Sequence, residues 1–546
     1  MFSKGNLDRK EILKQIAPVI FTLVLFVLLI TGLTSNIPDP DAFYHIRHSW
    51  IYRTSGIFDS SFPWTQYSVI KDIGADLWYG FHIFILPLTY FPNLVDGIKF
   101  GGTLMMFFSL LLAYMAFRKL SLRWPLFWVF VFALGAADIL YRLTMLRPHP
   151  ITISLTLLLF AFFTSKNHQA VILEKNSNGI FWIFLISAAY SWLHLSLSWV
   201  PILTVLTIGL FRLVYRQRVN WPQSFSLLIG LAVGWLLRPN PFGAAKLAYI
   251  QVLKLLVDKQ GGLPLRFGKE LLPFVWENFV DMLIPISVLM LLAVGFFIWV
   301  LRKKDFLAIA NEMKPVFWSS LALAVFFFVL SFILARRSNE FFIGFGVIFL
   351  GLVFTHYFNL RHRIPKFYFA SWLTKIIGVI IVAALIYGPI KTVYRYDTYI
   401  ANAFAPERFR EVAEWLQLNS NPGEIVFNLQ WDRFAQVFFW NYQNYYINGM
   451  DPIFELAYSP SLYWKNHYLF IDQFFVQDGV AKVCGEIRCS VDMVEDIYMV
   501  LFRDFKASFL FLEKNRNPKL YNYLKTDSRF ENVFETDFEA VFRIKP

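Results

Sequence analysis

The chain has 546 residues, of which 57% are hydrophobic, 19% aromatic and only 16% charged. Soluble globular proteins contain about 45–50% apolar and about 25% charged residues. The composition therefore excludes a disordered chain, a disulfide-rich secreted scaffold and an ordinary soluble enzyme, and it predicts a membrane protein with one water-soluble part. The net charge of +13 would suit nucleic acid in a soluble protein. In a membrane protein basic residues mark cytoplasmic loops, so we expect no nucleic-acid partner.

About eleven apolar segments are candidates for membrane-spanning helices, each of which needs about 20 mostly apolar residues. In chain order they are residues 16–36, 100–117, 124–141, 150–164, 179–193, 199–214, 221–237, 282–301, 316–334, 341–357 and 376–390. The apolar stretch 77–94 contains His82, Pro87 and Pro92. We expect it to form a helix at the outer membrane surface and not a further span.

The basic residues give this arrangement a direction, because they favour the cytoplasmic side of a membrane. Lys4, Arg9, Lys10 and Lys14 precede the first segment, so the N-terminus is expected in the cytoplasm. Alternate loops are basic as well: Arg118/Lys119/Arg123, Lys166/Lys175, Arg212/Arg216/Arg218, Arg302/Lys303/Lys304 and Arg361/Arg363/Lys366. An odd number of spans then places the residues after 394 outside the cytoplasm.

Two domains are predicted on this basis. Residues 1–394 form a polytopic α-helical membrane domain with outer loops at 36–93 and 238–281, and residues 395–546 form a small extracytoplasmic α/β domain. In the second domain, residues 406–417 have the apolar spacing of an amphipathic helix, and 424–429 and 507–513 are typical of buried strands. Cys484 and Cys489 are predicted either to form a bridge or to remain as two thiols.

Polar residues at the membrane boundary indicate where function lies. In the first outer loop Asp39 and Asp41 are closely followed by His45 and Arg47. Carboxylates are the ligands that hard cations such as Mg²⁺ or Mn²⁺ prefer. The alternative interpretation is that the two aspartates cap the helix that follows.

Two further groups of charged residues stand on the same expected side. The first contains Arg142, Arg147 and His149, which suit a phosphate clamp and a metal or proton carrier, or alternatively surface residues that reach into lipid headgroups. The second is the pair Arg336 and Arg337. A lipid-linked phosphate would explain two adjacent arginines on the outer face, and so would ordinary anionic headgroups.

Together these residues resemble the GT-C class of membrane glycosyltransferases, and among them the catalytic subunits of oligosaccharyltransferases. Residues 41–47, Asp-Ala-Phe-Tyr-His-Ile-Arg, are similar to the first-loop signature of that family, Asp-x-x-Phe/Tyr-Asn/His-x-Arg. His149 stands where the family has an acidic metal ligand, and Arg337 stands where it has the arginine that holds the donor phosphate. Trp431-Asp432 is similar to the centre of the family's Trp-Trp-Asp-Tyr-Gly motif. The flanking residues Gln430, Arg433 and Phe434 depart from it, which speaks against recognition of a Ser/Thr sequon.

The resemblance implies transfer of a sugar or glycan from a polyprenyl phosphate or diphosphate donor to a protein or glycan acceptor on the outer face of the cytoplasmic membrane. A divalent metal, Mg²⁺ or Mn²⁺, would assist. The implied roles are as follows: catalytic, Asp39, Asp41, Arg142 and His149; metal ligands, Asp41 and His149; donor phosphate, Arg336 and Arg337; acceptor side, His45, Arg47, Trp431 and Asp432. The alternatives are a transporter or flippase of lipid-linked sugars and a non-catalytic protein of envelope assembly.

Overall fold

The computed structural model describes residues 9–33, 35–165, 177–266, 268–302, 309, 311–360, 371–489 and 494–546. Several basic loop residues on which the predicted topology depends lie outside this part of the chain: Lys4, Lys166, Lys175, Lys303, Lys304, Arg361, Arg363 and Lys366. The described residues fall into two compact units. Unit 1 comprises Met1–Pro38, Lys99–Leu236 and Gly268–Ala403, and unit 2 comprises Asp39–Ile98, Leu237–Phe267 and Phe404–Pro546.

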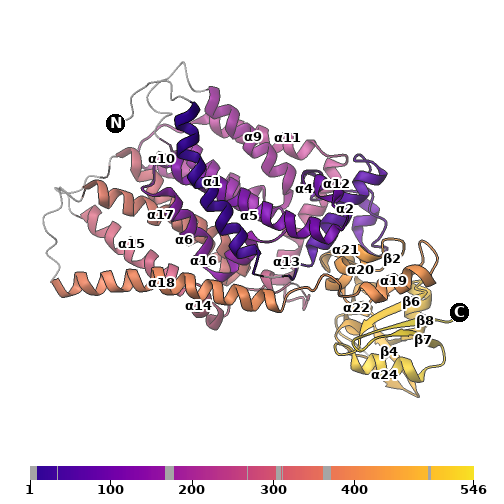
Figure 1. Ribbon diagram of the computed structural model, residues 1–546. Helices are drawn as coiled ribbons and strands as arrows, with labels where there is room; N and C mark the ends of the chain where they lie inside the picture. Colours follow the sequence, from indigo (N-terminus) through magenta and orange to yellow (C-terminus); the bar gives the residue numbers. More distant parts are fainter. Residues whose placement is uncertain are drawn as a thin grey trace. The chain divides into compact units, whose positions relative to one another are not determined.

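Unit 1 is helical (Figure 1). Its α-helices are α1 (Arg9–Thr31), α5 (Leu94–Lys119, whose first turn belongs to unit 2), α6 (Pro125–Leu134), α7 (Ala137–Leu143), α8 (His149–Thr164), α9 (Ser177–Leu193), α10 (Trp199–Val214), α11 (Trp221–Leu236), α14 (Trp276–Met282), α15 (Ile284–Arg302), α16 (Lys314–Ile333), α17 (Asn339–Leu360) and α18 (Ser371–Ala401). Short 3₁₀ turns precede several of them: η3 (Leu195–Leu197), η5 (Lys269–Leu271), η6 (Asn311–Met313) and η7 (Arg336–Ser338).

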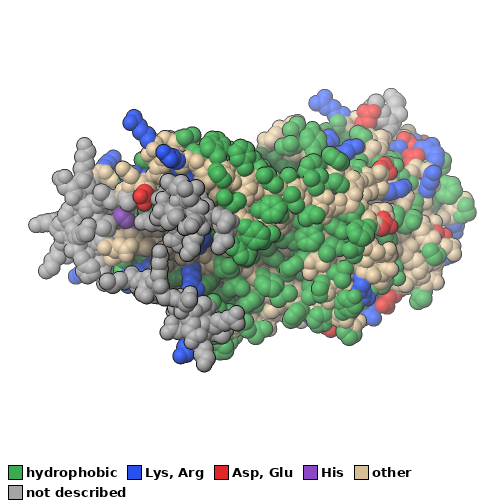
Figure 2. All heavy atoms as spheres, turned by 90° about the horizontal axis from the view of Figure 1, so that it is seen from above, with side chains coloured by type: hydrophobic (Ala, Val, Ile, Leu, Met, Phe, Trp, Pro, Cys, Tyr) green, Lys and Arg blue, Asp and Glu red, His purple; other side chains and the backbone are tan. Residues whose placement is uncertain are grey.

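Some of these helices are long and apolar enough to cross a bilayer. Within the described residues five satisfy both criteria: Leu94–Lys119, Leu195–Val214, Asn311–Ile333, Arg336–Asn359 and Lys375–Ala401. Five shorter apolar helices accompany them: Ile16–Thr31, His149–Thr164, Gly179–Leu193, Trp221–Leu236 and Ile284–Trp299. Figure 2 shows hydrophobic side chains spread over much of the face that it draws. The chain is thus an integral membrane protein by its apolar helices, although the predicted count of about eleven spans is not confirmed.

One predicted span is broken. Residues 124–141 were expected as a single helix, but α6 ends at Leu134 and α7 continues at an angle of 102°. At the break the hydroxyl of Thr392 donates a hydrogen bond of 3.0 Å to the carbonyl of Leu134, which satisfies an acceptor that a continuous helix would use internally. The break matters for the site, because it turns α7 and its charged residues away from the direction of α6.

Close helix packing in unit 1 uses small residues. Gly230 and Gly234 of α11 face α9, and a Cβ atom at Gly234 would lie only 2.0 Å from the carbonyl oxygen of Ala188. Small residues four positions apart let two helix backbones approach in this way, which is common in membrane proteins.

Unit 2 combines the first of the two predicted outer loops, part of the second and the C-terminal region. Its helices are α2 (Asp41–Ser55), α3 (Val69–Ile73), α4 (Tyr79–Ile85), η1 (Leu86–Tyr90), α12 (Pro241–Tyr249), η4 (Ile250–Lys254), α13 (Leu255–Gln260), α19 (Arg410–Asn419), η8 (Trp431–Arg433), α20 (Phe434–Trp440), α21 (Ile453–Tyr458), α22 (Pro460–Phe470), α23 (Ile497–Met499), η10 (Val500–Asp504) and α24 (Pro518–Thr526). The helix predicted over 77–94 is present as the shorter pair α4 and η1, and the side chain of His82 on α4 is buried. The amphipathic helix predicted over 406–417 is confirmed as α19.

The strands of unit 2 form two sheets. They are β1 (Ile425–Asn428), β2 (Tyr445–Tyr446), β3 (Phe475–Gln477), β4 (Val480–Cys484), β5 (Val494–Asp496), β6 (Phe509–Glu513), β7 (Phe530–Glu535) and β8 (Glu539–Ile544). The larger sheet has the order β2-β1-β6-β8-β7. β1 pairs in parallel with β2 and β6, and β8 pairs antiparallel with β6 and β7. β1 and β6 are the two strands that the sequence predicted.

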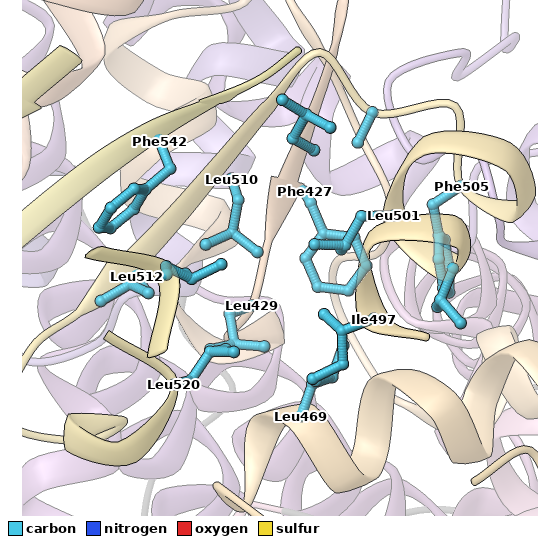
Figure 3. Close-up of a cluster of buried hydrophobic side chains, with 14 of the residues drawn as sticks. Phe427, Leu429, Leu469, Ile497, Leu501, Phe505, Leu510, Leu512, Leu520 and Phe542 are labelled. Carbon is cyan, nitrogen blue, oxygen red and sulfur yellow. The ribbon is translucent and has the colours of Figure 1, made fainter. Parts of the chain in front are cut away.

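The larger sheet is covered by an apolar core. Its fully buried side chains come from both sheet strands and covering helices (Figure 3), among them Phe427, Leu469, Leu501, Leu510 and Phe542. Every residue of β6 is buried, as expected of a central strand with both faces covered.

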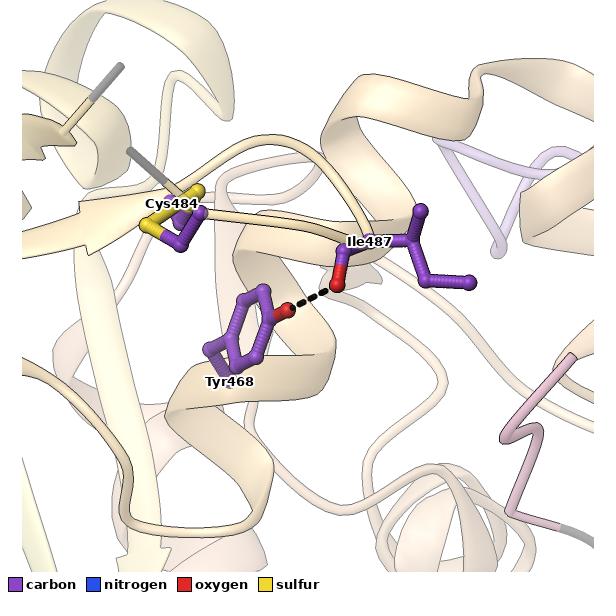
Figure 4. Close-up of a disulfide and its surroundings, with 4 residues drawn as sticks. Tyr468, Cys484 and Ile487 are labelled. Carbon is purple, nitrogen blue, oxygen red and sulfur yellow. Dashed lines mark hydrogen bonds between the residues drawn. A yellow bond between two sulfur atoms is a disulfide. The ribbon is translucent and has the colours of Figure 1, made fainter. Parts of the chain in front are cut away.

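The two cysteines form a disulfide, Cys484–Cys489 (Figure 4). The sequence left this bridge and two free thiols open, and the bridge is what the structure has. It closes a short loop after β4, in which the carbonyl of Ile487 accepts a hydrogen bond of 3.0 Å from the hydroxyl of Tyr468. Disulfides persist in oxidising compartments, which agrees with an extracytoplasmic location for this region.

Candidate functional site

In unit 1 the charged residues singled out in the sequence gather around α7. Because Asp138 and Arg142 are four residues apart on this helix, they lie on the same face one turn from each other. The turn η7, directly before α17, supplies Arg336 and Arg337. α7 and η7 thus bring together residues almost 200 positions apart in the sequence.

The two adjacent arginines have different partners. Arg336 forms a two-point ion pair with Asp138, in which Nε lies 2.8 Å from Oδ2 and Nη2 lies 2.6 Å from Oδ1. Asn339 donates a third hydrogen bond, of 3.2 Å, to the same carboxylate. Arg337 makes a looser ion pair, with Nη1 3.5 Å from Oε1 of Glu270.

Glu270 lies at the centre of a group of three arginines, Arg142, Arg147 and Arg337. The sequence patterns did not identify it as a site residue. Its Oε2 accepts a hydrogen bond from Nη2 of Arg142, and its Oε1 lies 3.6 Å from Nη1 of Arg147 and 3.5 Å from Nη1 of Arg337. Nε of Arg142 also lies 2.8 Å from Oε1 of Glu340. Burial by itself raises the pKa of Glu270, but Arg142, Arg337 and Arg147 more than offset this and hold the pKa well below its ordinary value.

Several buried polar atoms in this group have no hydrogen-bond partner among the described residues. They are Nδ1 and Nε2 of His149, Nη2 of Arg337 and Oε2 of Glu340. The ring of His149 stands edge-on against that of His194, with centroids 4.2 Å apart. Buried polar groups are nearly always hydrogen-bonded. The unsatisfied Nη2 of Arg337 and the single N–H of the His149 ring are donors that suit a polar, anionic ligand.

In unit 2 the first-loop residues begin α2. Asp41 is the first residue of this helix, and its N-cap residue is Pro40, whose ring makes no capping hydrogen bond. The backbone carbonyl of Asp39 accepts a hydrogen bond of 3.3 Å from the N–H of Ala42 in the first turn, so both interpretations of the two aspartates, as helix caps and as metal ligands, stay predictions. Asp39 is buried, with 4% of its surface exposed.

His45 continues into a buried chain of hydrogen bonds. Its Nδ1 lies 2.8 Å from Nε2 of His82, and Nδ1 of His82 donates to Oδ2 of Asp76 at 2.6 Å. The same Oδ2 accepts a hydrogen bond of 3.0 Å from the hydroxyl of Tyr52. Asp76 and His82 were not predicted as site residues, although both are polar residues next to or within an apolar stretch of the sequence.

His48 packs against this chain of hydrogen bonds. The centroids of the His48 and His82 rings are 4.4 Å apart. Burial, and then the neighbouring His82, lower the pKa of His48 to about 3. Burial by itself raises the pKa of Asp76, but His82 and His48 outweigh it and hold this pKa well below its ordinary value. The carboxylate is therefore charged and both of its oxygens are engaged, since Oδ1 also accepts from the backbone N–H of Trp78 at 2.8 Å.

The described residues contain one group that meets the spacing of a metal site. Ligand atoms of His48, Asp76 and His82 lie within 4.8 Å of one another. Two imidazoles and a carboxylate are ligands that Zn²⁺ accepts, so the group could hold such an ion. The predicted ligands Asp41 and His149 belong to units 2 and 1 respectively, and their convergence on one metal stays a prediction.

The predicted acceptor-side residues lie on α2 and at η8, all in unit 2. Arg47 donates from Nε to the carbonyl of Phe439 at 2.9 Å, and its guanidinium lies 4.9 Å from the ring centroid of Trp50. Asp432, on η8 beside Trp431, pairs with Arg516 at 3.1 Å. Arg47 thus ties α2 to the end of α20, the helix that follows the Trp431-Asp432 motif.

Comparison of the sequence with protein-family models gives no match, and comparison with curated proteins gives none either. Solved structures do match in fold. An oligosaccharyltransferase from Archaeoglobus fulgidus is similar with a TM-score of 0.61 and 13% identity, over 92% of this chain and 70% of the other. A further structure of that enzyme is a complex with Zn and sulfate.

Two other transferases are similar over nearly the whole chain. ArnT from Cupriavidus metallidurans matches with a TM-score of 0.52 and 12% identity, over 97% of this chain and 98% of the other. The arabinofuranosyltransferase AftD from Mycobacteria matches with a TM-score of 0.50 and 13% identity, over 96% of this chain and 40% of the other. The chain therefore shares the fold of the GT-C membrane glycosyltransferases, as the sequence motifs predicted.

Proposed function

We propose that this protein is a GT-C-type glycosyltransferase that moves a sugar or glycan from a polyprenyl phosphate or diphosphate donor to an acceptor on the outer membrane face. The observation that carries the proposal is the cluster around Arg337. Nη2 of this arginine is buried without a hydrogen-bond partner among the described residues, and so are both ring nitrogens of His149. A phosphate presents acceptor oxygens that would bind Nη2 of Arg337 and the single N–H of the His149 ring.

A lipid-linked donor fits the apolar character of unit 1. An isoprenoid chain leaves a bilayer only at a large free-energy cost, so an enzyme that uses such a donor needs its site at the membrane boundary. Among the structures similar in fold, the archaeal oligosaccharyltransferase is known in complex with dolichol-phosphate, and ArnT is known bound to undecaprenyl phosphate. These ligands support a donor of the same chemical class here.

The proposed chemistry is a single displacement at the sugar carbon. As the bond from sugar to phosphate breaks, negative charge develops on the leaving phosphate, and the guanidinium of Arg337 would stabilise it. Asp41 would accept the proton of the acceptor group that attacks the sugar. His45, Arg47, Trp431 and Asp432 would lie on the acceptor side.

A divalent metal is part of the proposal as a supporting group. Asp41 and His149 are the predicted ligands, and His48, Asp76 and His82 are a second donor set with suitable spacing. When bound, such an ion offsets negative charge on a phosphate. Metal analysis of the purified protein, with His48→Gln and Asp41→Asn compared side by side, distinguishes the two sets.

The test is transfer by the purified full-length protein supplied with a lipid-linked sugar pool. Asp41→Ala and Arg337→Ala are expected to lose at least 100-fold in transfer while the protein still inserts and folds. Asp59→Ala and Arg410→Ala are matched controls, because Asp59 is exposed in the same loop as Asp41 and Arg410 is an exposed arginine on α19. Normal transfer by the two site variants would exclude the site, and an absence of transfer by the wild type would favour a transporter or an assembly protein.

A further inference from the structure

We propose that Glu270 restricts the donor to a lipid that carries a single phosphate charge, a polyprenyl monophosphate sugar, and discriminates against a diphosphate. This inference rests on the proposed function, since it concerns the donor of the same site. Glu270 is a specificity-determining residue in this proposal, because it sets how much negative charge the arginine cluster accepts.

The first step concerns how the arginines are neutralised. Arg142 is bound on two sides, by Oε2 of Glu270 and by Oε1 of Glu340 at 2.8 Å. The other oxygen of Glu270 is shared between Arg147 and Arg337, at 3.6 and 3.5 Å. These two distances are too long for hydrogen bonds, so Arg337 interacts with Glu270 through charge alone.

The second step identifies where a ligand would bind. Nη2 of Arg337 is buried and has no hydrogen-bond partner among the described residues, in contrast to Arg336, which is held by Asp138. Arg337 therefore keeps a donor for one more anionic oxygen. His149, whose two ring nitrogens are also without partners in the described part of the chain, lies within electrostatic range of Arg337 and Arg142.

The third step concerns charge. A sugar joined to a polyprenyl monophosphate is a phosphodiester with one negative charge, whereas a sugar joined through a diphosphate brings two. A phosphate bound by Arg337 lies close to the carboxylate of Glu270, because that carboxylate is 3.5 Å from the same guanidinium. One negative charge is balanced by Arg337. A second would face a like charge in a partly buried site, where such repulsion is strong.

The fourth step is that Glu270 is held in place. In the segment that follows it, the carbonyl of Leu272 accepts a hydrogen bond of 2.8 Å from the backbone N–H of Arg336, and the N–H of Phe274 donates one of 2.9 Å to the carbonyl of Ser331. These backbone contacts join the segment to α16 and η7. The backbone that carries Glu270 is therefore tied to α16 and η7, and its carboxylate is held by the hydrogen bond from Nη2 of Arg142.

The experiment compares two probes that differ by one charge: an isoprenyl methyl phosphate and the corresponding isoprenyl methyl diphosphate. Their binding to the purified full-length protein is measured by calorimetry in detergent, with and without Mn²⁺. The wild type is expected to bind the methyl phosphate at least tenfold more tightly in both conditions. Glu270→Gln, which removes one negative charge at nearly constant shape, is expected to bind the methyl diphosphate at least tenfold more tightly than the wild type does.

Glu277→Gln is the matched control, since Glu277 lies exposed on α14 in the same unit; its preference should equal that of the wild type. Equal or tighter binding of the diphosphate by the wild type, in either condition, overturns the inference while leaving the proposed function intact. An unchanged preference in Glu270→Gln also overturns it. If neither probe binds the wild type, the proposed function itself fails. The wild-type comparison decides the matter even if Glu270→Gln does not fold.

Discussion

Arg336 and Asp138 face each other in a two-point ion pair, with Nε–Oδ2 and Nη2–Oδ1 distances of 2.8 and 2.6 Å. The adjacent Arg337 has no such partner and keeps an unsatisfied Nη2 within the described residues. Two neighbouring arginines that are indistinguishable in the sequence thus have different surroundings. Arg336 fixes the turn η7, and this turn presents Arg337 to the cluster around Glu270.

The first prediction separates these two roles. Arg336→Gln leaves the carboxylate of Asp138 without its cation, and removing one partner of a largely buried pair costs about 3 kcal/mol of stability. We expect a clear fall in the melting temperature, measured in detergent by intrinsic fluorescence. Arg337→Gln is expected to keep the wild-type melting temperature and to lose donor binding. A wild-type melting temperature in Arg336→Gln would contradict this division.

The second prediction concerns a buried acid in unit 2. Glu455, on α21, accepts hydrogen bonds from Asn448 and Asn466 at 2.8 and 2.9 Å, and burial raises its pKa to about 8. Its ordinary pKa is about 4.3, so between these values the folded protein binds a proton that the unfolded chain does not. The contribution of Glu455 to the free energy of unfolding is therefore fully present below about pH 4.3. It falls by about 1.4 kcal/mol per pH unit as the pH rises from there towards 8.

Glu455→Gln removes the ionisable group but keeps its shape. We expect this variant to melt at a higher temperature than the wild type at pH 8 and to show a weaker fall in melting temperature between pH 6 and 8. Glu407→Gln, at an exposed position, is the control and should follow the wild type. A wild-type pH dependence in Glu455→Gln would mean that this carboxyl group titrates normally.

The third prediction concerns the buried chain that ends at Asp76. Asp76→Asn removes a charge on which Nδ1 of His82 and the hydroxyl of Tyr52 both depend. We expect a loss of about 3 kcal/mol, because the partners stay buried while the charge that stabilises them is gone. Thermal unfolding of the purified variant measures the loss. Asp72→Asn, four residues earlier and exposed, should be neutral, and similar melting of both variants would speak against the chain as a stabilising element.

The fourth prediction concerns the disulfide Cys484–Cys489. The chain has two cysteines and both are in this bridge, so alkylation of the unreduced, denatured protein is expected to label no thiol in mass spectrometry. A cross-link that closes so short a loop stabilises by about 2 kcal/mol in the chain-entropy description. The double variant Cys484→Ser/Cys489→Ser should therefore fold and melt at a modestly lower temperature. Full labelling without reductant would exclude the bridge.

Part of the fold could be read from local sequence patterns. Long apolar runs predict the helices of unit 1, because a helix that crosses a bilayer needs about 20 mostly apolar residues. Short apolar runs predict β1 and β6, because the strands of a buried sheet are apolar. The local pattern did not predict where a helix is broken. Residues 124–141 are apolar enough on average for one span, yet the chain bends by 102° after Leu134. Thr392, far along the chain, donates a hydrogen bond to the carbonyl at the break.

The candidate site divides in the same way. The sequence by itself predicted a helical membrane protein with the GT-C fold, and it singled out the carboxylates of the first predicted outer loop and the adjacent arginines Arg336 and Arg337, because composition and short motifs are local properties of the chain. Only the tertiary structure decided that Arg336 is held by Asp138, that His82 is bound to Asp76, and that Glu270 lies among arginines such as Arg142, 128 positions away. A single carboxylate in a long loop has no distinguishing sequence pattern. It acquires a role only when folding places cations around it, since the energy of a charge depends on its neighbours in space.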